Sequence, residues 1–175
     1  ARRGEVRLTG VDYRAVSTVA LSLAESGCEV RSEADAVSLR STGALRSVRP
    51  VRTAPYPGFP TDAQPVLMAA LLRSEGYTVF VENIFENRYR HVDELSRMGA
   101  EIRVAGRVAV VNGVRTLHGA AVKCTDLRGG AALVIAGLSA EGTTRVTELT
   151  HIDRGYDAIE RDLAALGAQI RRETT

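Results

Sequence analysis

The sequence contains no tryptophan, and aromatic residues make up only 5% of its 175 residues. These few aromatics do not alternate with basic residues, which argues against a stacking surface for single-stranded nucleic acid. Cysteine occurs only at positions 28 and 124, too rarely for a disulfide framework or a paired-cysteine metal motif. We therefore expect Cys28 and Cys124 to be small buried side chains, in a chain that works in the reducing cytoplasm.

Long apolar runs are also missing. No stretch approaches the roughly 18–20 apolar residues that cross a bilayer, and residues 1–5 are followed by no export-signal core. The three histidines, His91, His118 and His151, are too dispersed for a metal cluster, and no phosphate-binding, hydrolase or dinucleotide motif occurs. We expect no membrane contact, no metal and no cofactor.

Charge of either sign is moderate. A formal net charge of +2 is too small to predict binding to nucleic acid. Lys123 is the only lysine, so arginine supplies nearly all the positive charge. Guanidinium groups suit anionic oxygens held by two hydrogen bonds, although arginine-rich composition alone also produces many solvated surface arginines. The length and the 45% hydrophobic content fit one globular domain.

Three segments of the chain repeat one pattern, in which a leucine is followed four residues later by a glycine and then by alternating residues. They are residues 23–31, 95–103 and 163–171, separated by 72 and 68 residues. The pattern predicts helices over 13–26, 91–98 and 156–166, each ended by a glycine in the left-handed region and followed by a short strand.

The second and third copies carry an additional helix before this pattern. Helices are predicted over 63–74 and 127–140, each after a Thr-Asp pair and before a strand, at 77–81 and 143–147. The first copy has only a strand at 5–8 before its helix, and the third lacks the closing strand that the second has at 108–111. We predict an α+β domain of three units, about 1–48, 49–112 and 113–175, around a pseudo-threefold axis, with the first and last incomplete.

Two clusters have the composition of a functional site. Residues 55–62 form a loop stiffened by prolines that ends at Asp62, which either supplies a carboxylate to a site or caps the helix beginning at 63. Residues 150–156 and 86–91 both place an arginine just before a helix, where it can meet an anion or remain a solvated surface group.

Four segments that include these clusters resemble UDP-N-acetylglucosamine 1-carboxyvinyltransferases, a family of enolpyruvyl transferases. They are RTAPYPGFPTDAQ (52–64), ENIFENRYRHVDELSRMGA (82–100), TDLRGGAALVIAGLSAEGTT (125–144) and HIDRGYDAIERDLAALGA (151–168). They occur in the family's order and spacing. The related shikimate-phosphate transferases share the architecture, but PYPGFPTDAQ and HIDRGY resemble the UDP-sugar branch.

The resemblance implies an inverse α/β barrel-like domain with helices inside and sheets outside. It implies transfer of the enolpyruvyl group of phosphoenolpyruvate to the 3-hydroxyl of UDP-N-acetylglucosamine, the first step of peptidoglycan precursor synthesis. Asp62 then contacts that hydroxyl and takes its proton, and Ile84 with Phe85 contacts the UDP-sugar. Arg128 and Arg154 match arginines that hold phosphoenolpyruvate or close over it. Supporting polar positions match Arg88 and Asp126.

The family's reactive cysteine, with a lysine and further arginines, lies on another domain, and neither Cys28 nor Cys124 matches it. We therefore expect the chain to be inactive alone and to require that companion domain. The alternative is a non-catalytic module that binds a UDP-sugar or a protein partner. Incomplete units also predict an uncovered sheet edge, which invites a homodimer.

Overall fold

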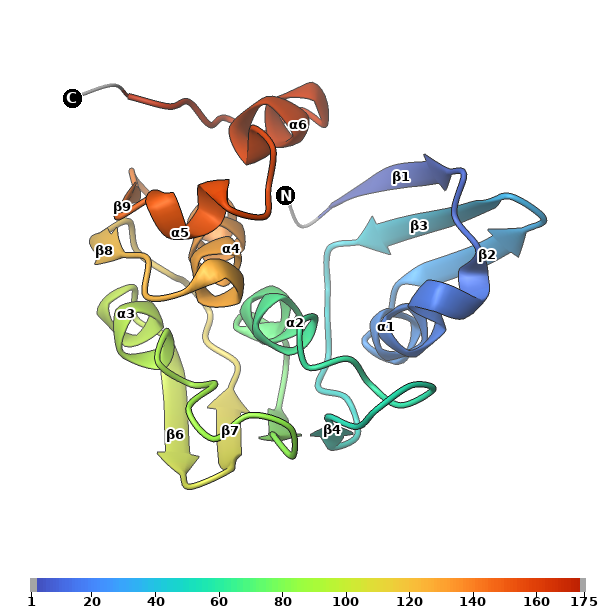
Figure 1. Cartoon of the computed structure of the whole chain (residues 1–175), viewed down its shortest axis with the longest axis horizontal. Helices are drawn as coiled ribbons and strands as arrows, with labels where there is room; N and C mark the ends of the chain where they lie inside the picture. The colour runs from blue at the N-terminus through green and yellow to red at the C-terminus, as the bar shows by residue number, and fades with distance from the viewer. Residues whose placement is uncertain (1–2, 174–175) are drawn as a thin grey trace.

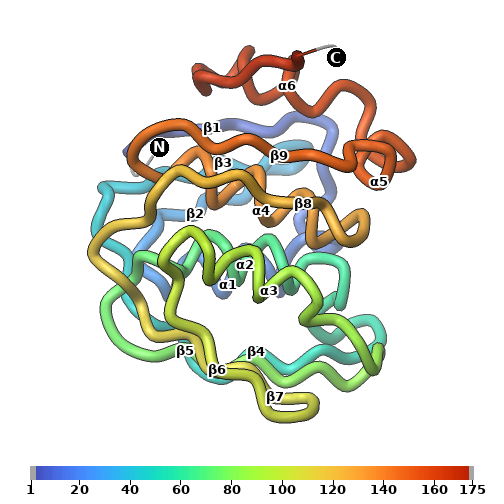
Figure 2. The backbone as a smooth tube through the Cα atoms, turned by 90° about the vertical axis from the view of Figure 1, so that its left-hand side faces the viewer, coloured from blue at the N-terminus to red at the C-terminus, as the bar shows by residue number. Residues whose placement is uncertain are grey.

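The computed structural model describes residues 3–173. Three separate β-sheets lie on the outside and surround a group of helices (Figure 1). The turned view shows α2 and α3 between the β8–β9 sheet and the strands β4–β7 (Figure 2). This arrangement confirms the predicted inverse barrel-like α+β domain. Every helix within residues 3–173 is too short or too polar to cross a lipid bilayer.

The first sheet has the strand order β1-β3-β2, with all neighbours antiparallel. A single helix, α1, connects β1 to β2 and starts at Asp12, whose side chain accepts a hydrogen bond from Arg14 N. The elements of this unit are β1 (Arg3–Thr9), α1 (Tyr13–Glu25), β2 (Glu29–Glu33) and β3 (Ala36–Thr42).

The second sheet has the order β4-β5-β7-β6, in which only β4 and β5 are parallel. Two helices precede its closing hairpin, as the sequence predicts. The elements are β4 (Val51–Arg52), α2 (Gln64–Leu71), β5 (Tyr77–Val81), α3 (Val92–Arg97), β6 (Glu101–Ala105) and β7 (Val108–Asn112).

The third sheet contains only the parallel pair β8 and β9. Its elements are β8 (Ala121–Lys123), α4 (Leu127–Ser139), β9 (Arg145–Thr147), α5 (Thr150–Asp153) and α6 (Ile159–Ala165). Here the predicted helix over 156–166 starts only at Ile159, because Ala158 adopts a left-handed conformation with φ of 51°. The short helix α5 was not predicted.

The predicted strand at 169–171 is wrong. In the first two units this segment pairs with the next strand, as β2 pairs with β3 and β6 with β7. Within residues 3–173 no strand follows residue 171 to supply that partner. Residues 169–171 therefore have the alternating sequence of a strand but not the hydrogen bonds that define one.

All three repeated helix ends have the same hydrogen bonds. Gly27, Gly99 and Gly167 have φ values of 108°, 89° and 91°, which a residue with a Cβ adopts only at a cost. The following residue donates its N–H to the carbonyl of the repeated leucine, at 3.0, 3.2 and 3.0 Å. These are Schellman ends, and they confirm the repeat at the level of local structure. The boundaries of the units stay a prediction.

The core lies where α2 packs against α4. Leu71, Met68 and Leu133 are fully buried, and the cluster continues under β5 and β7 through Phe80 and Val111. Full burial of each such side chain stabilises the fold by about 1.5–3 kcal/mol. Because α2 and α4 each follow a Thr-Asp pair, their packing brings both pairs to one region of the surface.

Candidate substrate site

The loop before Asp62 is closed and anchored. Ala54 donates its N–H to the Phe59 carbonyl at 3.0 Å, and the Phe59 side chain is buried. The helix α2 then begins at Gln64 with Ala63 at its N-cap and no side-chain cap. The interpretation of Asp62 as a helix cap is therefore wrong, and its carboxylate faces two arginines instead.

Asp62 is held by side chains from two other elements. Its Oδ2 accepts from Arg128 Nη2 at 2.8 Å, and its Oδ1 is 3.4 Å from Arg88 Nη2. The Asp62 side chain is 55% exposed, whereas the side chains of Arg88 and Arg128 are 11% and 28% exposed. The Asp62 carboxylate thus has both oxygens near guanidinium groups and yet remains open to solvent, as a group that contacts a bound hydroxyl must be.

Each arginine also lies against an aromatic ring. The Arg88 guanidinium is 4.4 Å from the centre of the Phe85 ring, and that of Arg128 is 5.8 Å from the Tyr156 ring. Arg128 Nη1 is also 3.4 Å from the Tyr156 hydroxyl. The hydrogen bond with Asp62, and then that with Tyr156, outweigh burial and raise the pKa of Arg128. Both cations are thus fixed in position before any ligand binds.

Asp126 positions Arg128 through the backbone. It is the N-cap of α4, where its Oδ1 accepts from the N–H groups of Arg128 and Gly129 at 3.0 and 2.8 Å. The prediction of a helix cap is confirmed here. Arg128 therefore occupies the first turn of a capped helix, which restricts where its side chain can reach.

The segment Ile84–Phe85 is exposed beside this cluster. These two side chains are 41% and 51% exposed, unusually open for large apolar groups. Their backbone N–H groups donate to Glu82 Oε1 at 2.8 and 3.0 Å. Glu82 itself is buried and also accepts from the hydroxyls of Thr53 and Thr61. An exposed apolar surface on a fixed backbone can receive the flat or apolar part of a ligand.

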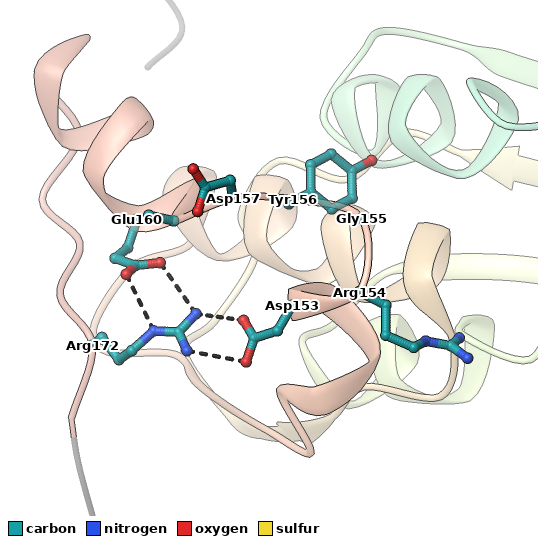
Figure 3. Close-up of a pocket in the computed structure, with 8 residues that line it drawn as sticks. Asp153, Arg154, Gly155, Tyr156, Asp157, Glu160 and Arg172 are labelled. Atoms are coloured by element: carbon teal, nitrogen blue, oxygen red, sulfur yellow. Dashed lines mark hydrogen bonds and ion pairs between the residues drawn. The ribbon is translucent and has the colours of Figure 1, made fainter.

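Arg154 lies apart from the Asp62 cluster. It follows α5 and lines an open cavity of about 590 Å³, together with Tyr156 and residues of the C-terminal segment. Within that cavity Arg172 pairs with Asp153 and Glu160 at 2.7 and 3.2 Å, while Arg154 points away from this network (Figure 3). Among residues 3–173 no hydrogen bond or ion pair involves the Arg154 side chain, so this cation is free for an anion.

Both cysteines are buried and free, as the sequence predicts. Burial raises the pKa of the Cys124 thiol. A raised pKa keeps the thiol protonated at neutral pH, so Cys124 lacks the thiolate that a nucleophile requires.

Comparison with known proteins shows which family the chain belongs to. A sequence profile described as EPSP synthase (3-phosphoshikimate 1-carboxyvinyltransferase) matches residues 1–163. The UDP-N-acetylglucosamine 1-carboxyvinyltransferase of Desulfofundulus thermocisternus is 52% identical over 98% of this chain and 70% of its own length. The chain belongs to the enolpyruvyl transferase family. The enzyme of the same name from Gluconacetobacter diazotrophicus is 50% identical, but this chain spans only 40% of its length.

Solved structures of enolpyruvyl transferases share the fold. The enolpyruvyl transferase NikO of Streptomyces tendae superposes with a TM-score of 0.83 at 30% identity, over 95% of this chain and 40% of its own. EPSP synthase of Acinetobacter baumannii gives a TM-score of 0.75 at 21% identity, also over 40% of its length. The chain thus corresponds to under half of these enolpyruvyl transferases.

Among the residues that the resemblance to enolpyruvyl transferases selects, the structure brings together Asp62, Arg88 and Arg128, with Phe85 against Arg88. Asp126 lies directly beneath Arg128, and Ile84 follows on the same segment as Phe85. Within residues 3–173 no hydrogen bond or ion pair joins Arg154 to them. Their roles toward substrates stay predictions.

Sequence reasoning missed Glu82, Thr61 and Tyr156. A signal for Glu82 was present, because Thr78 and Phe80 are the buried positions of β5 and Glu82, directly after the strand, continues their alternation. A charged residue at such an inward position is unusual and calls for a dedicated set of donors. Thr61 and Tyr156 carry no comparable pattern, since their importance comes from partners far away in the chain.

Proposed function

We propose that residues 1–175 form one substrate-binding domain of an enolpyruvyl transferase, acting on phosphoenolpyruvate and UDP-N-acetylglucosamine in the cytoplasm. The observation that carries the proposal is Asp62, an exposed carboxylate fixed between Arg88 and Arg128 beside the Ile84–Phe85 segment. The names of the relatives at 52% and 50% identity support the UDP-sugar as the acceptor substrate.

The proposed chemistry begins when the sugar's 3-hydroxyl binds within hydrogen-bond reach of Asp62. Asp62 accepts the hydroxyl proton as the hydroxyl oxygen bonds to the central carbon of phosphoenolpyruvate, while the methylene carbon takes a proton from a group outside this chain, which later takes a proton back. That carbon then loses a proton as the carbon–oxygen bond to phosphate breaks, which restores the double bond and releases phosphate. Arg128 and Arg154 balance the negative charge of the carboxylate and phosphate groups throughout.

Ile84 and Phe85 are the proposed contact for the UDP-sugar. Their N–H groups are occupied by Glu82, so the segment offers its exposed side chains and carbonyl groups rather than new donors. The apolar area removed from water there contributes binding free energy. Asp126 acts indirectly, because its cap sets the position of Arg128.

A companion domain belongs to the proposal, because the chain spans 40% of the Gluconacetobacter diazotrophicus enzyme. The test is a chimera in which residues 1–175 replace the matching segment of that enzyme. We expect the chimera to release phosphate only when both substrates are present, and the isolated chain to stay at background. A folded chimera without turnover would contradict the proposed function.

The alternative of a non-catalytic binding module gives a different result in the same experiment. It predicts that calorimetric titration of the isolated chain with UDP-N-acetylglucosamine shows binding, while the chimera shows no phosphate release. Retention of Asp62 between two arginines favours the catalytic proposal, since a module that only binds needs no exposed proton acceptor.

A further inference from the structure

Glu82 is a buried carboxylate without a cation. It is 1% exposed, and within residues 3–173 it forms no ion pair. A charge removed from water is tolerated only when hydrogen bonds replace the lost hydration. The residues around Glu82 are therefore arranged to donate to it.

Those donors come from three separate segments of the chain. Oε1 accepts from Thr53 Oγ1 at 2.9 Å and from the N–H groups of Ile84 and Phe85 at 2.8 and 3.0 Å. Oε2 accepts from Thr61 Oγ1 at 3.0 Å. One oxygen thus organises the exposed segment of the proposed sugar site, and the other is bonded to the residue preceding Asp62.

The hydrogen bond between Thr61 and Glu82 fixes the direction of the Thr61 hydroxyl hydrogen. Thr61 Oγ1 donates to Glu82 Oε2, so its single hydroxyl hydrogen points at Glu82. The lone pairs of Thr61 Oγ1 are left for Arg88, whose Nε donates to that oxygen at 3.1 Å. Arg88 Nη2 in turn lies 3.4 Å from Asp62 Oδ1. Glu82, Thr61 and Arg88 form a chain of hydrogen bonds that ends at Asp62, called the Glu82 relay below.

We propose that Glu82 is a positioning residue, which orients Arg88 through Thr61 and so holds Asp62 in place for proton transfer. The inference rests on the proposed function for its effect on turnover, but the relay itself is a property of the chain. Glu82 itself is buried and is not proposed to touch a substrate. Its effect reaches the site through the direction of one hydroxyl group.

Glu82→Gln separates the two halves of this arrangement. The glutamine oxygen must face Thr53, Ile84 and Phe85, because the amide nitrogen there would meet three donors. The amide nitrogen then donates to one lone pair of Thr61 Oγ1, so the Thr61 hydrogen loses its acceptor at residue 82 and Arg88 Nε–H shares this oxygen with a second donor. The variant keeps the shape of the side chain and its hydrogen bonds to the Ile84–Phe85 segment, but it reverses the direction of the hydrogen bond between residue 82 and Thr61.

The first measurement uses the 175-residue chain and NMR exchange of single N–H groups with water. We expect exchange of Arg88 Nε–H to accelerate at least about tenfold in Glu82→Gln and in Thr61→Val, while the Ile84 and Phe85 amides of Glu82→Gln stay within about threefold. Thr53→Val is the matched control, because it removes a donor from Oε1 and leaves the relay intact. Unchanged Arg88 exchange in Glu82→Gln, or equal acceleration in Thr53→Val, would overturn the proposal.

The second measurement is turnover in the chimera. Glu82→Gln is expected to lower kcat about tenfold or more with KM for UDP-N-acetylglucosamine within about threefold, since positioning rather than binding is lost. Adding Thr61→Val should cause little further loss, because both changes break the same chain of bonds. Normal kcat in Glu82→Gln would refute the relay. If the chimera with unsubstituted residues 1–175 were inactive, only the proposed function would be refuted. The hydrogen exchange of Arg88 Nε–H in the 175-residue chain would still test the relay.

Discussion

Asp62 and Asp126 follow the same Thr-Asp pattern, yet their carboxylates are used differently. Asp126 accepts two backbone N–H groups of its own helix. The helix α4 begins directly after Asp126, whereas α2 begins at Gln64, two residues after Asp62. The oxygens of Asp62 face Arg88 and Arg128 instead. One additional residue between the aspartate and the first helical residue is enough to turn a cap into a site carboxylate.

Asp62→Asn is expected to lower turnover of the chimera by about 10²–10⁴-fold, because asparagine keeps the shape but cannot accept a proton at neutral pH. The free energy of unfolding should change by less than about 1 kcal/mol, since asparagine keeps an oxygen acceptor for the arginines and the side chain at position 62 is 55% exposed. Steady-state kinetics and thermal unfolding of the same samples provide the check. Near-normal turnover with a lowered melting temperature would return Asp62 to a structural role.

His91 lies fully buried at the start of α3, and neither ring nitrogen has a hydrogen-bond partner among residues 3–173. Burial lowers the pKa of His91 to about 4, against the opposing effects of the Asp126 charge and the Arg88 backbone. In the unfolded chain the pKa is the ordinary 6.5. Between pH 6.5 and 4 the unfolded state therefore binds a proton that the folded state does not.

The free energy of unfolding should therefore decrease as the pH falls from 6.5 to 4, by at most about 3 kcal/mol from this group. His91→Phe removes the titrating ring and keeps a buried ring at this position, so the stability of this variant should fall less over that pH range. Urea unfolding at a series of pH values measures the slope. His118→Gln, at an exposed position, is the control and should keep the native slope. An equal slope in His91→Phe would contradict the assignment.

The helix α4 joins the core to the site. Gly130 lets its first turn approach Cys124 and Ile152, because a Cβ there would lie 2.2 Å from Cys124 Sγ. The same turn is capped by Asp126 and carries Arg128. The position of Arg128 thus depends on close packing on one side of the helix and on a cap at its end.

Asp126→Ala should destabilise the chain by about 0.5–2 kcal/mol, because two N–H groups lose their acceptor. Asp126→Asn should lose much less, since asparagine is an equally good cap. Asp62→Ala is the matched comparison and should have a smaller effect than Asp126→Ala. The midpoint of urea unfolding at constant m-value measures all three. Equal losses in Asp62→Ala and Asp126→Ala would mean that the cap contributes nothing specific.

The three outer sheets have edges without partners in the described part of the chain. β1 pairs only with β3, and β9 pairs only with β8. Large apolar side chains are exposed near such edges, with Leu8 of β1 at 48%. Unpaired edges are templates for pairing with another strand, and the homodimer stays a prediction.

Self-association of the isolated chain is therefore expected in sedimentation equilibrium, with an apparent mass that rises with concentration. Leu8→Lys should weaken the association, because a charge on an edge strand opposes pairing. Leu21→Lys on α1, at a residue that is 60% exposed, is the control and should not. A monomer at every concentration, or an equal effect of both lysines, would contradict association through the β1 edge.

Much of the fold could be predicted from local signals in the chain. The Schellman ends at Gly27, Gly99 and Gly167 and the cap at Asp126 involve hydrogen bonds between residues a few positions apart. Such bonds depend on the identity of neighbouring residues, so repeated residues produce repeated geometry. The strand at 169–171 failed because its partner is not a local property.

The candidate site was decided by the packing of distant elements. Arg128 is 66 residues from Asp62 in the sequence, and the two meet only because α2 packs against α4. The burial of Glu82 likewise depends on Thr53 and Thr61, which come from segments before β5. Residue types and spacing predicted which helices and turns form. The tertiary structure decided which charged side chains face one another, because the apolar faces of α2 and α4 are buried against each other. The hydrophobic effect that drives this burial is non-directional, so the residue pattern of one helix does not reveal its partner.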